Sequence, residues 1–169
     1  MSVSPARPPE APVLALEQPE DAAQVEALLD RAFGPGRFTK VSERVREVAA
    51  FAPDLSFCAH LNGDLVGSVR LWRVKAGDQP IVFLGPLAVE TSARHHGLGV
   101  QLTARACAAA ESAGETAVVL VGDQPFFGRV GFAVARDVIL PGPVDPKRVL
   151  VRAFHPVELS GLVRARGSA

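Results

Sequence analysis

The apolar positions of the chain are densest between residues 81 and 113, where two patterns follow each other. Residues 81–89 form an almost continuous apolar run, which is typical of a strand covered on both faces. After a short polar turn, apolar residues recur at helical spacing on one side of an alanine-rich segment: Leu98, Leu102, Ala106, Ala109 and Ala113. The pattern predicts a central strand–turn–helix unit.

The segments before this unit read as two helices followed by an antiparallel meander. Residues 13–16 predict a first strand, and a helix that begins near Pro19 ends at Gly34-Pro35-Gly36. Residues 40–51 show the apolar stripe of a second helix. The apolar runs 55–61 and 65–74 flank Asn62-Gly63, a strong hairpin signal, and a second turn over 76–80 leads into the central strand.

The segments after this unit complete a mixed sheet. Residues 117–121 predict a buried strand that is parallel to the central one, because a helix connects the two. A short helix over 124–130 and strands over 132–134 and 149–154 follow, and the apolar patch 157–163 either docks on the domain or frays. Pro86 cannot donate to a strand ladder, so we expect a bulge and an interrupted sheet there.

The turn between the central strand and its helix carries the chemistry. Gly97 and Gly99 let a ligand approach the backbone at a helix start, where unpaired N–H groups and the helix dipole favour an anion such as a pyrophosphate. Arg94 and His95 add positive charge. A glycine-rich turn that merely begins a helix is the simpler alternative. The sequence contains neither a P-loop nor the third glycine of a dinucleotide fingerprint.

Residues 84–132 resemble the core of the GCN5-related N-acetyltransferases, the GNAT superfamily, in the form found in its YhbS-like branch. The loop Arg94-His95-His96-Gly97-Leu98-Gly99 matches the family's acyl-CoA motif R/Q-x-x-G-x-G/A. The run 84–89 is similar to the family's central strand, and Gly122-Asp123 and 129–132 resemble its later strand and closing helix.

The resemblance implies an α/β (α+β) fold with a mixed, mostly antiparallel sheet of six to seven strands. Helices cover both faces, and the sheet splays between its fourth and fifth strands, at 81–89 and 117–121. Acetyl-CoA is the implied cofactor. Its diphosphate would contact the loop residues Arg94, His95, His96, Gly97, Leu98, Gly99 and Val100. Its pantetheine arm would pair with the backbone of Leu87, Ala88 and Val89, as an added strand does.

The implied activity is acetyl-CoA-dependent N-acetyl transfer to a primary amine of a small molecule or peptide, by direct attack in a ternary complex. The attacking amine must be neutral, and an N–H near Ala88 could stabilise the developing oxyanion. Glu90 and Asp123 are the two candidate bases; either could instead bind a cationic substrate or cap a helix. Phe33, Phe38 and Phe51 could be acceptor-pocket walls or ordinary core aromatics.

The chain departs from the family pattern at Phe127, which by the resemblance would pack against the cofactor arm. The family's usual proton donor to the departing thiolate is a Tyr at this position, and the sequence contains 0 Tyr. Phe has no proton to donate. A non-catalytic domain that binds or senses acyl-CoA is therefore the alternative function.

Composition bounds these expectations. The 169 residues fit one domain over residues 13–169, preceded by a disordered proline-rich tail over residues 1–12. A formal net charge of zero argues against nonspecific binding of nucleic acid through its phosphates. No apolar run approaches the roughly 18 residues of a membrane span. Cys58 and Cys107 predict reduced thiols and a cytoplasmic protein, and no spacing suggests a metal site. The resemblance leaves a homodimer open.

Overall fold

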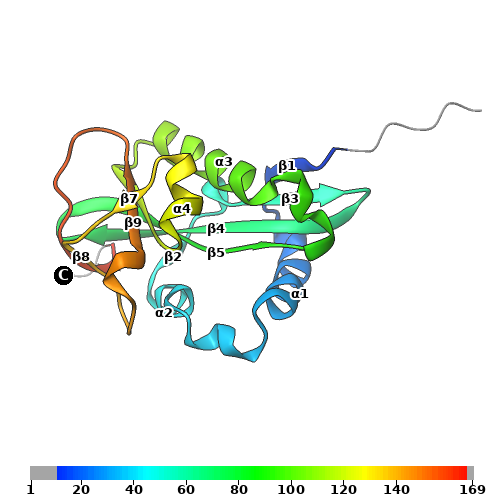
Figure 1. Cartoon of the computed structure of the whole chain (residues 1–169), viewed down its shortest axis with the longest axis horizontal. Helices are drawn as coiled ribbons and strands as arrows, with labels where there is room; N and C mark the ends of the chain where they lie inside the picture. The colour runs from blue at the N-terminus through cyan, green and yellow to red at the C-terminus, as the bar shows by residue number, and fades with distance from the viewer. Residues whose placement is uncertain (1–10, 167–169) are drawn as a thin grey trace, which may run out of the picture.

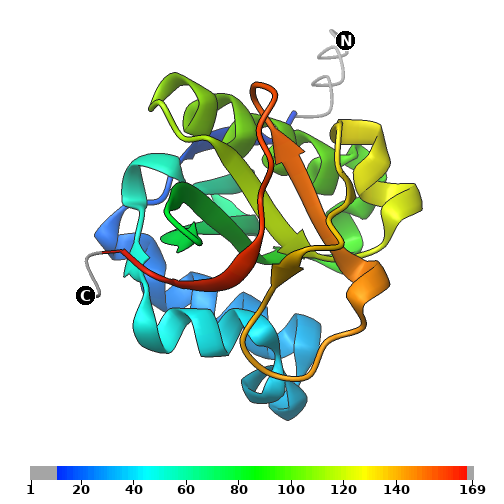
Figure 2. The ribbon, with the colours of Figure 1, turned by 90° about the vertical axis from the view of Figure 1, so that its left-hand side faces the viewer.

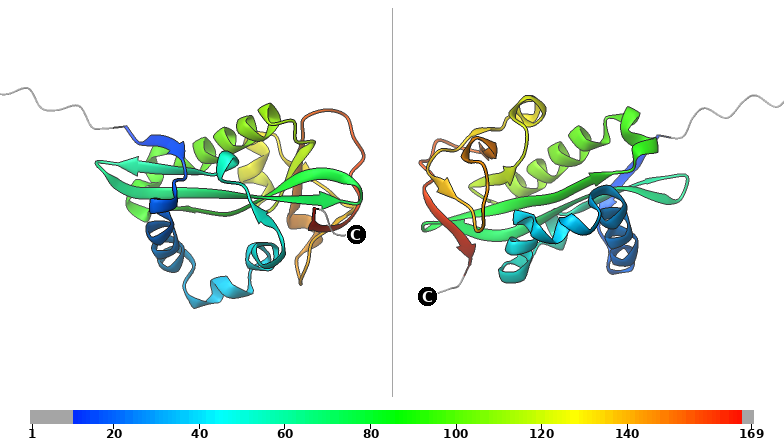
Figure 3. Two further views of the ribbon diagram at one scale, coloured as in Figure 1. Left: turned by 180° about the vertical axis from the view of Figure 1, so that it is seen from behind. Right: turned by 60° about the horizontal axis from the view of Figure 1, so that its bottom comes forward.

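The computed structural model describes residues 11–166 and has one sheet with helices on both faces. Residues 1–10, most of the segment predicted to be disordered, lie outside the described part, as do 167–169. In Figures 1 and 3, α1 (Ala22–Phe33) and α2 (Val41–Val48) lie on one face of the sheet, and α3 (Leu98–Ser112) and α4 (Gln124–Phe127) lie on the other. The predicted fold class is confirmed.

Seven of the ten strands form the main path of the sheet, in the order β1-β3-β4-β5-β6-β9-β7. All pairs on this path are antiparallel except β5 with β6, which are parallel as the helical crossover predicted. The bounds are β1 (Val13–Leu16), β3 (Phe57–Leu61), β4 (Asp64–Ala76), β5 (Gln79–Val89), β6 (Ala117–Val121), β7 (Ala133–Val134) and β9 (Val149–Ala153).

Three short strands were not predicted. The second helix ends at Val48 rather than at residue 51, and β2 (Ala50–Phe51) pairs with β4, where the Phe51 ring packs 5.2 Å from that of Trp72. The apolar patch after residue 156 docks: β10 (Gly161–Ala165) pairs with β4 and with β8 (Val138–Ile139). Beyond β10, Arg166 Nη2 donates to the Ile81 carbonyl at 2.7 Å, which fixes the end of the chain to β5.

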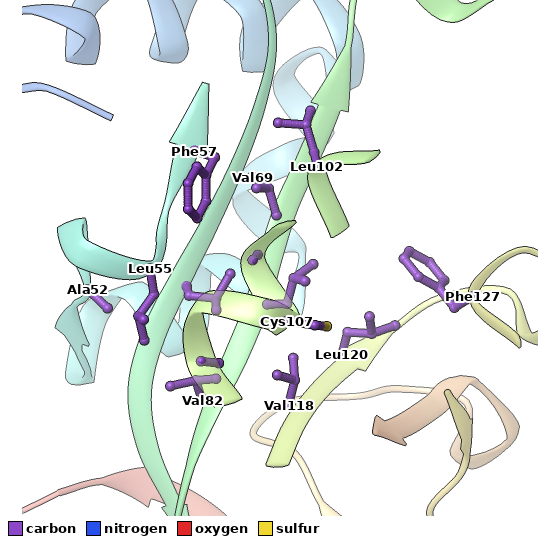
Figure 4. Packing of buried hydrophobic residues seen from close by; sticks show 14 of the residues in the cluster. Ala52, Leu55, Phe57, Val69, Val82, Leu102, Cys107, Val118, Leu120 and Phe127 are labelled. Carbon is purple, nitrogen blue, oxygen red and sulfur yellow. The ribbon is translucent and has the colours of Figure 1, made fainter. Parts of the chain in front are cut away.

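Alternate side chains of the sheet enter two different cores. Val82 and Leu84 of β5 face α3 and pack with Leu102 and Leu120, whereas Phe83 faces α2. Figure 4 shows the α3-side cluster, with Phe127 beyond Leu120 at its margin. A third, smaller cluster lies beneath α1. Because β5 is buried on both faces, its apolar run is continuous rather than alternating.

The sheet opens at the predicted bulge. Leu71 faces Leu84, but Val69 faces Leu87, so Gly85 and Pro86 together oppose the single residue Arg70. The Trp72 indole holds this bulge, because its Nε1 donates to the Gly85 carbonyl at 2.6 Å. Beyond it, β5 and β6 diverge.

Their pairing is confined to two positions, Val82 with Val118 and Phe83 with Val119, although β5 runs on to Val89 and β6 to Val121. The splay between these two strands, the fourth and fifth of the family pattern, is thus present. Backbone groups of β5 past the bulge therefore have no strand partner on their β6 side.

A network of ion pairs fixes the two N-terminal helices and the η2 turn (Pro35–Thr39) between them. The buried Arg37 guanidinium of η2 contacts three carboxylates: Glu26 at 2.8 Å, Asp30 at 2.9 Å and Glu43 at 3.0 Å. Glu26 also accepts from Arg70 of β4 at 2.8 Å. One continuous set of charges therefore ties α1, η2 and α2 to the sheet beneath them.

Candidate functional site

A cavity of about 700 Å³ occupies the opening between β5 and β6. Its lining comes from both faces of the sheet. Leu84, Leu120 and Phe127 belong to the α3-side core, whereas Phe83 and Val41 belong to the α2-side core. The cavity therefore crosses the sheet, and a ligand could enter it from either face.

The turn η4 (Thr91–His96) contributes Arg94 to the lining at one end of this cavity and leads into the start of α3, where Gly99 lies against the cavity-lining Phe126. Gly97 has left-handed backbone angles (φ 66°, ψ 28°) and is the N-cap residue of α3, where no side chain caps the helix. The first intrahelical bond runs from the Gln101 amide to the Gly97 carbonyl at 3.1 Å. The amides of Leu98, Gly99 and Val100 come before this first bond, so their N–H groups have no partner within the helix and can bind an anion.

Further residues of the η4 turn complete this end of the site. Arg94 lies in η4 and lines the cavity, so its positive charge faces the same space. His95 and His96 belong to the same turn, and the His96 carbonyl accepts from the Gln101 side chain at 2.7 Å. Gln101 thereby fixes the turn against the helix, a contact that the motif alone did not indicate.

The register of β4 and β5 determines which amides face the cavity. The Glu90 amide donates to the Val66 carbonyl at 2.8 Å, and these two residues lie opposite each other by the same register that pairs Ala88 with Ser68. Because hydrogen-bonded and non-bonded pairs alternate in an antiparallel ladder, the Ala88 N–H is directed towards β4. The Leu87 and Val89 N–H groups are directed the other way, into the opening.

Two adjacent phenylalanines close the space between the start of α3 and the end of β6. A Cβ placed on Gly99 would lie 3.1 Å from Phe126, and one on Gly122 would lie 2.3 Å from Phe127. The two rings meet edge to face at 4.7 Å. A side chain at Gly122 would therefore displace the Phe127 ring, whereas one at Gly99 would press closely on Phe126. Phe127, 9% exposed, presents its ring to the cavity.

The structure distinguishes the two candidate bases. Asp123 follows β6 and lines the cavity; its side chain is 76% exposed and lies 3.6 Å from the Arg148 Nε. Asp123 is the N-cap residue of α4, but its carboxylate makes no capping bond. Glu90 follows β5, does not line the cavity, and accepts from the Arg31 Nε of α1 at 2.8 Å.

The opposite mouth of the cavity is built by loops that carried no sequence motif. Figure 2 shows the connection between β8 and β9 descending towards the segment that joins α1 to α2. These segments and the first turn of α2 contribute Thr39, Lys40, Ser42, Pro143, Val144, Asp145 and Arg148. Of the three suggested aromatic walls, Phe33 lines the cavity, Phe51 packs on Trp72, and Phe38 is exposed beneath Arg37.

Neither cysteine belongs to the site. Cys58 and Cys107 are free and buried in separate cores. Burial raises the pKa of the Cys58 thiol to about 12 and that of Cys107 to about 11, so neither is a ready nucleophile. Within residues 11–166, no helix has the length and apolar character needed to cross a bilayer.

Comparisons with known proteins agree with this geometry. The model of the Acetyltransferase (GNAT) family matches residues 22–132. The chain is 30% identical over 125 residues to a protein of Escherichia coli K12 named uncharacterized N-acetyltransferase YhbS, and the match covers 73% of this chain and 74% of that protein.

Solved structures share the fold. The crystal structure of E. coli YhbS in complex with CoA superposes with a TM-score of 0.77 at 26% identity, covering 96% of this chain and 92% of that one. A GNAT family acetyltransferase from Brucella melitensis in complex with acetyl-CoA has a TM-score of 0.70 at 24% identity, with 92% and 96% covered.

Proposed function

Because the chain belongs to the GNAT acetyltransferase family and is thus an N-acetyltransferase, we propose that it binds acetyl-CoA in the cavity between β5 and β6. The acetyl group is transferred to a primary amine that enters from the opposite mouth. The observation that carries this proposal is the opening of the sheet after Phe83 and Val119, beside the uncapped start of α3.

The residues of this chain fit the cofactor along its length. The amides of Leu98, Gly99 and Val100 and the Arg94 guanidinium offer donors and charge for the diphosphate. The free N–H and C=O groups of Leu87 and Val89 can pair with the amides of the pantetheine arm, as a strand would. When bound, acetyl-CoA supplies an activated acetyl thioester whose carbon the amine attacks. Relatives of known structure hold CoA or acetyl-CoA.

An amide of β5 also supplies the hydrogen bond that stabilises the oxyanion formed during acetyl transfer. Charge develops on the carbonyl oxygen as the amine attacks, and a fixed N–H in a water-poor cleft stabilises it. The amides of Leu87 and Val89 are directed away from β4, and Leu87 lines the cavity. We therefore assign this role to one of these two neighbours of Ala88, because the Ala88 amide is directed towards β4.

Asp123 is the better placed base. The amine must lose a proton before or during attack, since a free alkylamine has a pKa of about 10. Asp123 lines the cavity with most of its carboxylate accessible to an amine or to a bridging water. The Glu90 carboxylate is bound by Arg31 and is positioned to tie α1 to the end of β5. Asp123→Asn should lower kcat by about 10²-fold or more, and Glu90→Gln should lower it less.

The departing CoA thiolate needs a proton, and Phe127 occupies the position from which a Tyr usually donates it in this family. Phe127 cannot protonate the departing thiolate, and the chain has no Tyr to replace it. Water admitted through the open cavity can supply the proton in its place. The Phe127 ring instead packs beside the channel and excludes other side chains from it.

The test is direct. Calorimetry with CoA should show one site, and acetyl-CoA with a panel of primary amines should release free thiol in step with acetylated amine. Gly99→Val should weaken CoA binding, because its side chain would meet Phe126 at the start of α3. A folded protein with no affinity for CoA would refute the proposal. Tight binding with no thiol release for any amine would refute the transfer step alone.

A further inference from the structure

The acidic side chains around the acceptor mouth already have partners. Arg31 binds Glu90, and Arg37 binds Glu26, Asp30 and Glu43. Two carboxylates line the cavity: Asp123 is 76% exposed and lies 3.6 Å from the Arg148 Nε, and Asp145 accepts from the Lys147 backbone amide at 3.0 Å. An acceptor with several positive charges would therefore meet only these two carboxylates in the cavity lining, one of them the proposed base with Arg148 beside it.

The positive charge at the same mouth is, by contrast, available. Lys40 lines the cavity at the junction of η2 and α2, and its side chain is exposed. Its Nζ lies 4.6 Å from the centroid of the Phe33 ring, which also lines the cavity. Among residues 11–166, no carboxylate lies within salt-bridge distance of this ammonium.

Two contacts keep Lys40 where it is. The Phe33 ring holds the ammonium by a cation–π contact at the end of α1. The backbone is fixed on its other side, because the Lys40 amide donates to the carbonyl of the buried Arg37 at 3.1 Å. The ammonium thus lies at the rim of the cavity on an anchored turn, and a point charge in that position favours an anion on the incoming molecule.

We infer that the acceptor is an amine that also carries an anionic group, which Lys40 binds while the amine points into the opening between β5 and β6. The apolar walls formed by Phe33, Val41 and Val144 would contact the carbon chain between the two groups. This inference rests on the proposed acetyl transfer and names the substrate class of the same site.

The test compares three amines of one chain length: 5-aminopentanoate, pentylamine and 1,5-diaminopentane. Their reacting amines have similar pKa values of about 10, so differences in rate report the far end of the molecule. We expect kcat/KM for 5-aminopentanoate to exceed that for pentylamine by about tenfold, as for a charge-assisted contact. The diamine should be the poorest of the three. Shorter and longer ω-amino acids, and 2-aminoethyl phosphate, set the preferred spacing and anion.

Substitutions assign the preference to Lys40. Lys40→Gln should abolish the advantage of 5-aminopentanoate, and Lys40→Glu should transfer it to the diamine. Lys147→Gln is the matched control. It removes the same charge from the neighbouring η6 turn (Pro146–Arg148), whose lysine does not line the cavity, and should leave the preference intact.

The outcomes separate this inference from the proposed function. If CoA does not bind, or no amine is acetylated, the proposed function fails. If amines are acetylated but 5-aminopentanoate has no advantage, or Lys40→Gln keeps that advantage, only the inference about the acceptor is overturned. A loss of CoA affinity in Lys40→Gln would also overturn it, because Lys40 would then belong to the cofactor site.

Discussion

At the scale of single residues, contacts between glycines and aromatic rings shape the site. Gly122 and Gly99 allow Phe127 and Phe126 to lie directly on the backbone between the end of β6 and the start of α3. Such contacts tolerate no added volume, because protein interiors are close-packed. The sequence alone gave both glycines as motif members, without revealing that their partners are the two adjacent phenylalanines.

Gly122→Ala should destabilise the fold and move Phe127. Its new Cβ would lie 2.3 Å from the Phe127 Cε2, so the ring must shift, and we expect a loss of about 1–3 kcal/mol in the free energy of unfolding. Urea denaturation measures it. Gly36→Ala, where a Cβ meets nothing within 4 Å, is the control and should change stability by less than about 0.5 kcal/mol. Equal losses in both variants would contradict the packing argument.

Phe127→Tyr should raise turnover. The added hydroxyl places a proton donor on a ring that already lines the cavity, and a positioned acid typically contributes about 10²-fold or more. A gain of about tenfold in kcat with unchanged CoA affinity would show that the acid was the missing group. Phe126→Tyr carries the same hydroxyl on the neighbouring ring and controls for a general effect of polarity. No gain in either variant would show that protonation of the thiolate does not limit the rate.

At the scale of elements, the α1–η2–α2 segment is held by charge as well as by the apolar faces of its helices. Glu26 is its centre. Burial raises the pKa of the Glu26 carboxyl, but hydrogen bonds from Arg46, Arg70 and Arg37 outweigh this effect and lower that pKa to about 2. The segment that carries Lys40 is therefore held by ionised carboxylates.

Acid should loosen this segment over a defined range. A carboxylate whose folded pKa is depressed stabilises the fold fully above its unfolded pKa, near 4.5, and loses that effect as the pH falls through about 2. Glu26→Gln should lower the free energy of unfolding by about 2 kcal/mol at pH 7, a value reduced by solvent screening. The difference from the natural protein should shrink below pH 4.5 and vanish near pH 2. Denaturant titrations at several pH values measure it.

The control for this prediction is Glu47→Gln. Glu47 is 59% exposed and contacts only the exposed Arg44, so its loss should change stability by less than about 0.5 kcal/mol. A Glu26→Gln deficit that stayed constant from pH 7 to pH 2 would show that packing, rather than charge, holds the segment.

Sequence patterns predicted those elements that are determined by residues close together in the chain. The hairpin at Asn62-Gly63, the β5–α3 unit and the bulge at Pro86 are of this kind, because each depends on residues close in sequence. β2 and β10 were not predicted, since each is stabilised by pairing with β4, a partner far along the chain. The same limit applies to the site. Residue chemistry proposed Glu90 and Asp123 equally. They are distinguished by the cavity, which Asp123 lines and Glu90 does not, and by Arg31, which is 59 residues from Glu90 in sequence.

At the scale of the whole molecule, the cavity divides the sheet into two halves, with β1 to β5 on one side and β6, β9 and β7 on the other. A ligand that pairs with the free backbone of β5 would add a connection between these halves. Binding should therefore stabilise the entire domain, by about 2.7 kcal/mol when CoA is present at 100 times its dissociation constant.

Amide exchange should report this connection residue by residue. In the free protein, the amides of Leu87 and Val89 should exchange faster than those of Val82 and Phe83, which lie in the paired part of the sheet. Saturating CoA should slow exchange at Leu87 and Val89 by about tenfold or more. Ala88, directed towards β4, is the internal control and should change less. Uniform slowing at all three residues would indicate general stabilisation rather than pairing with the arm.

The bulge at Gly85 and Pro86 has one further consequence, for self-association. Open N–H and C=O groups within a sheet resemble an exposed edge, which invites strands from other chains and leads to aggregation. Pro86 brings no N–H to such a pairing, and the misaligned register beside it would interrupt any intruding strand after a few residues. The bulge that opens the sheet for the narrow pantetheine arm thus also prevents a strand of another protein from pairing there.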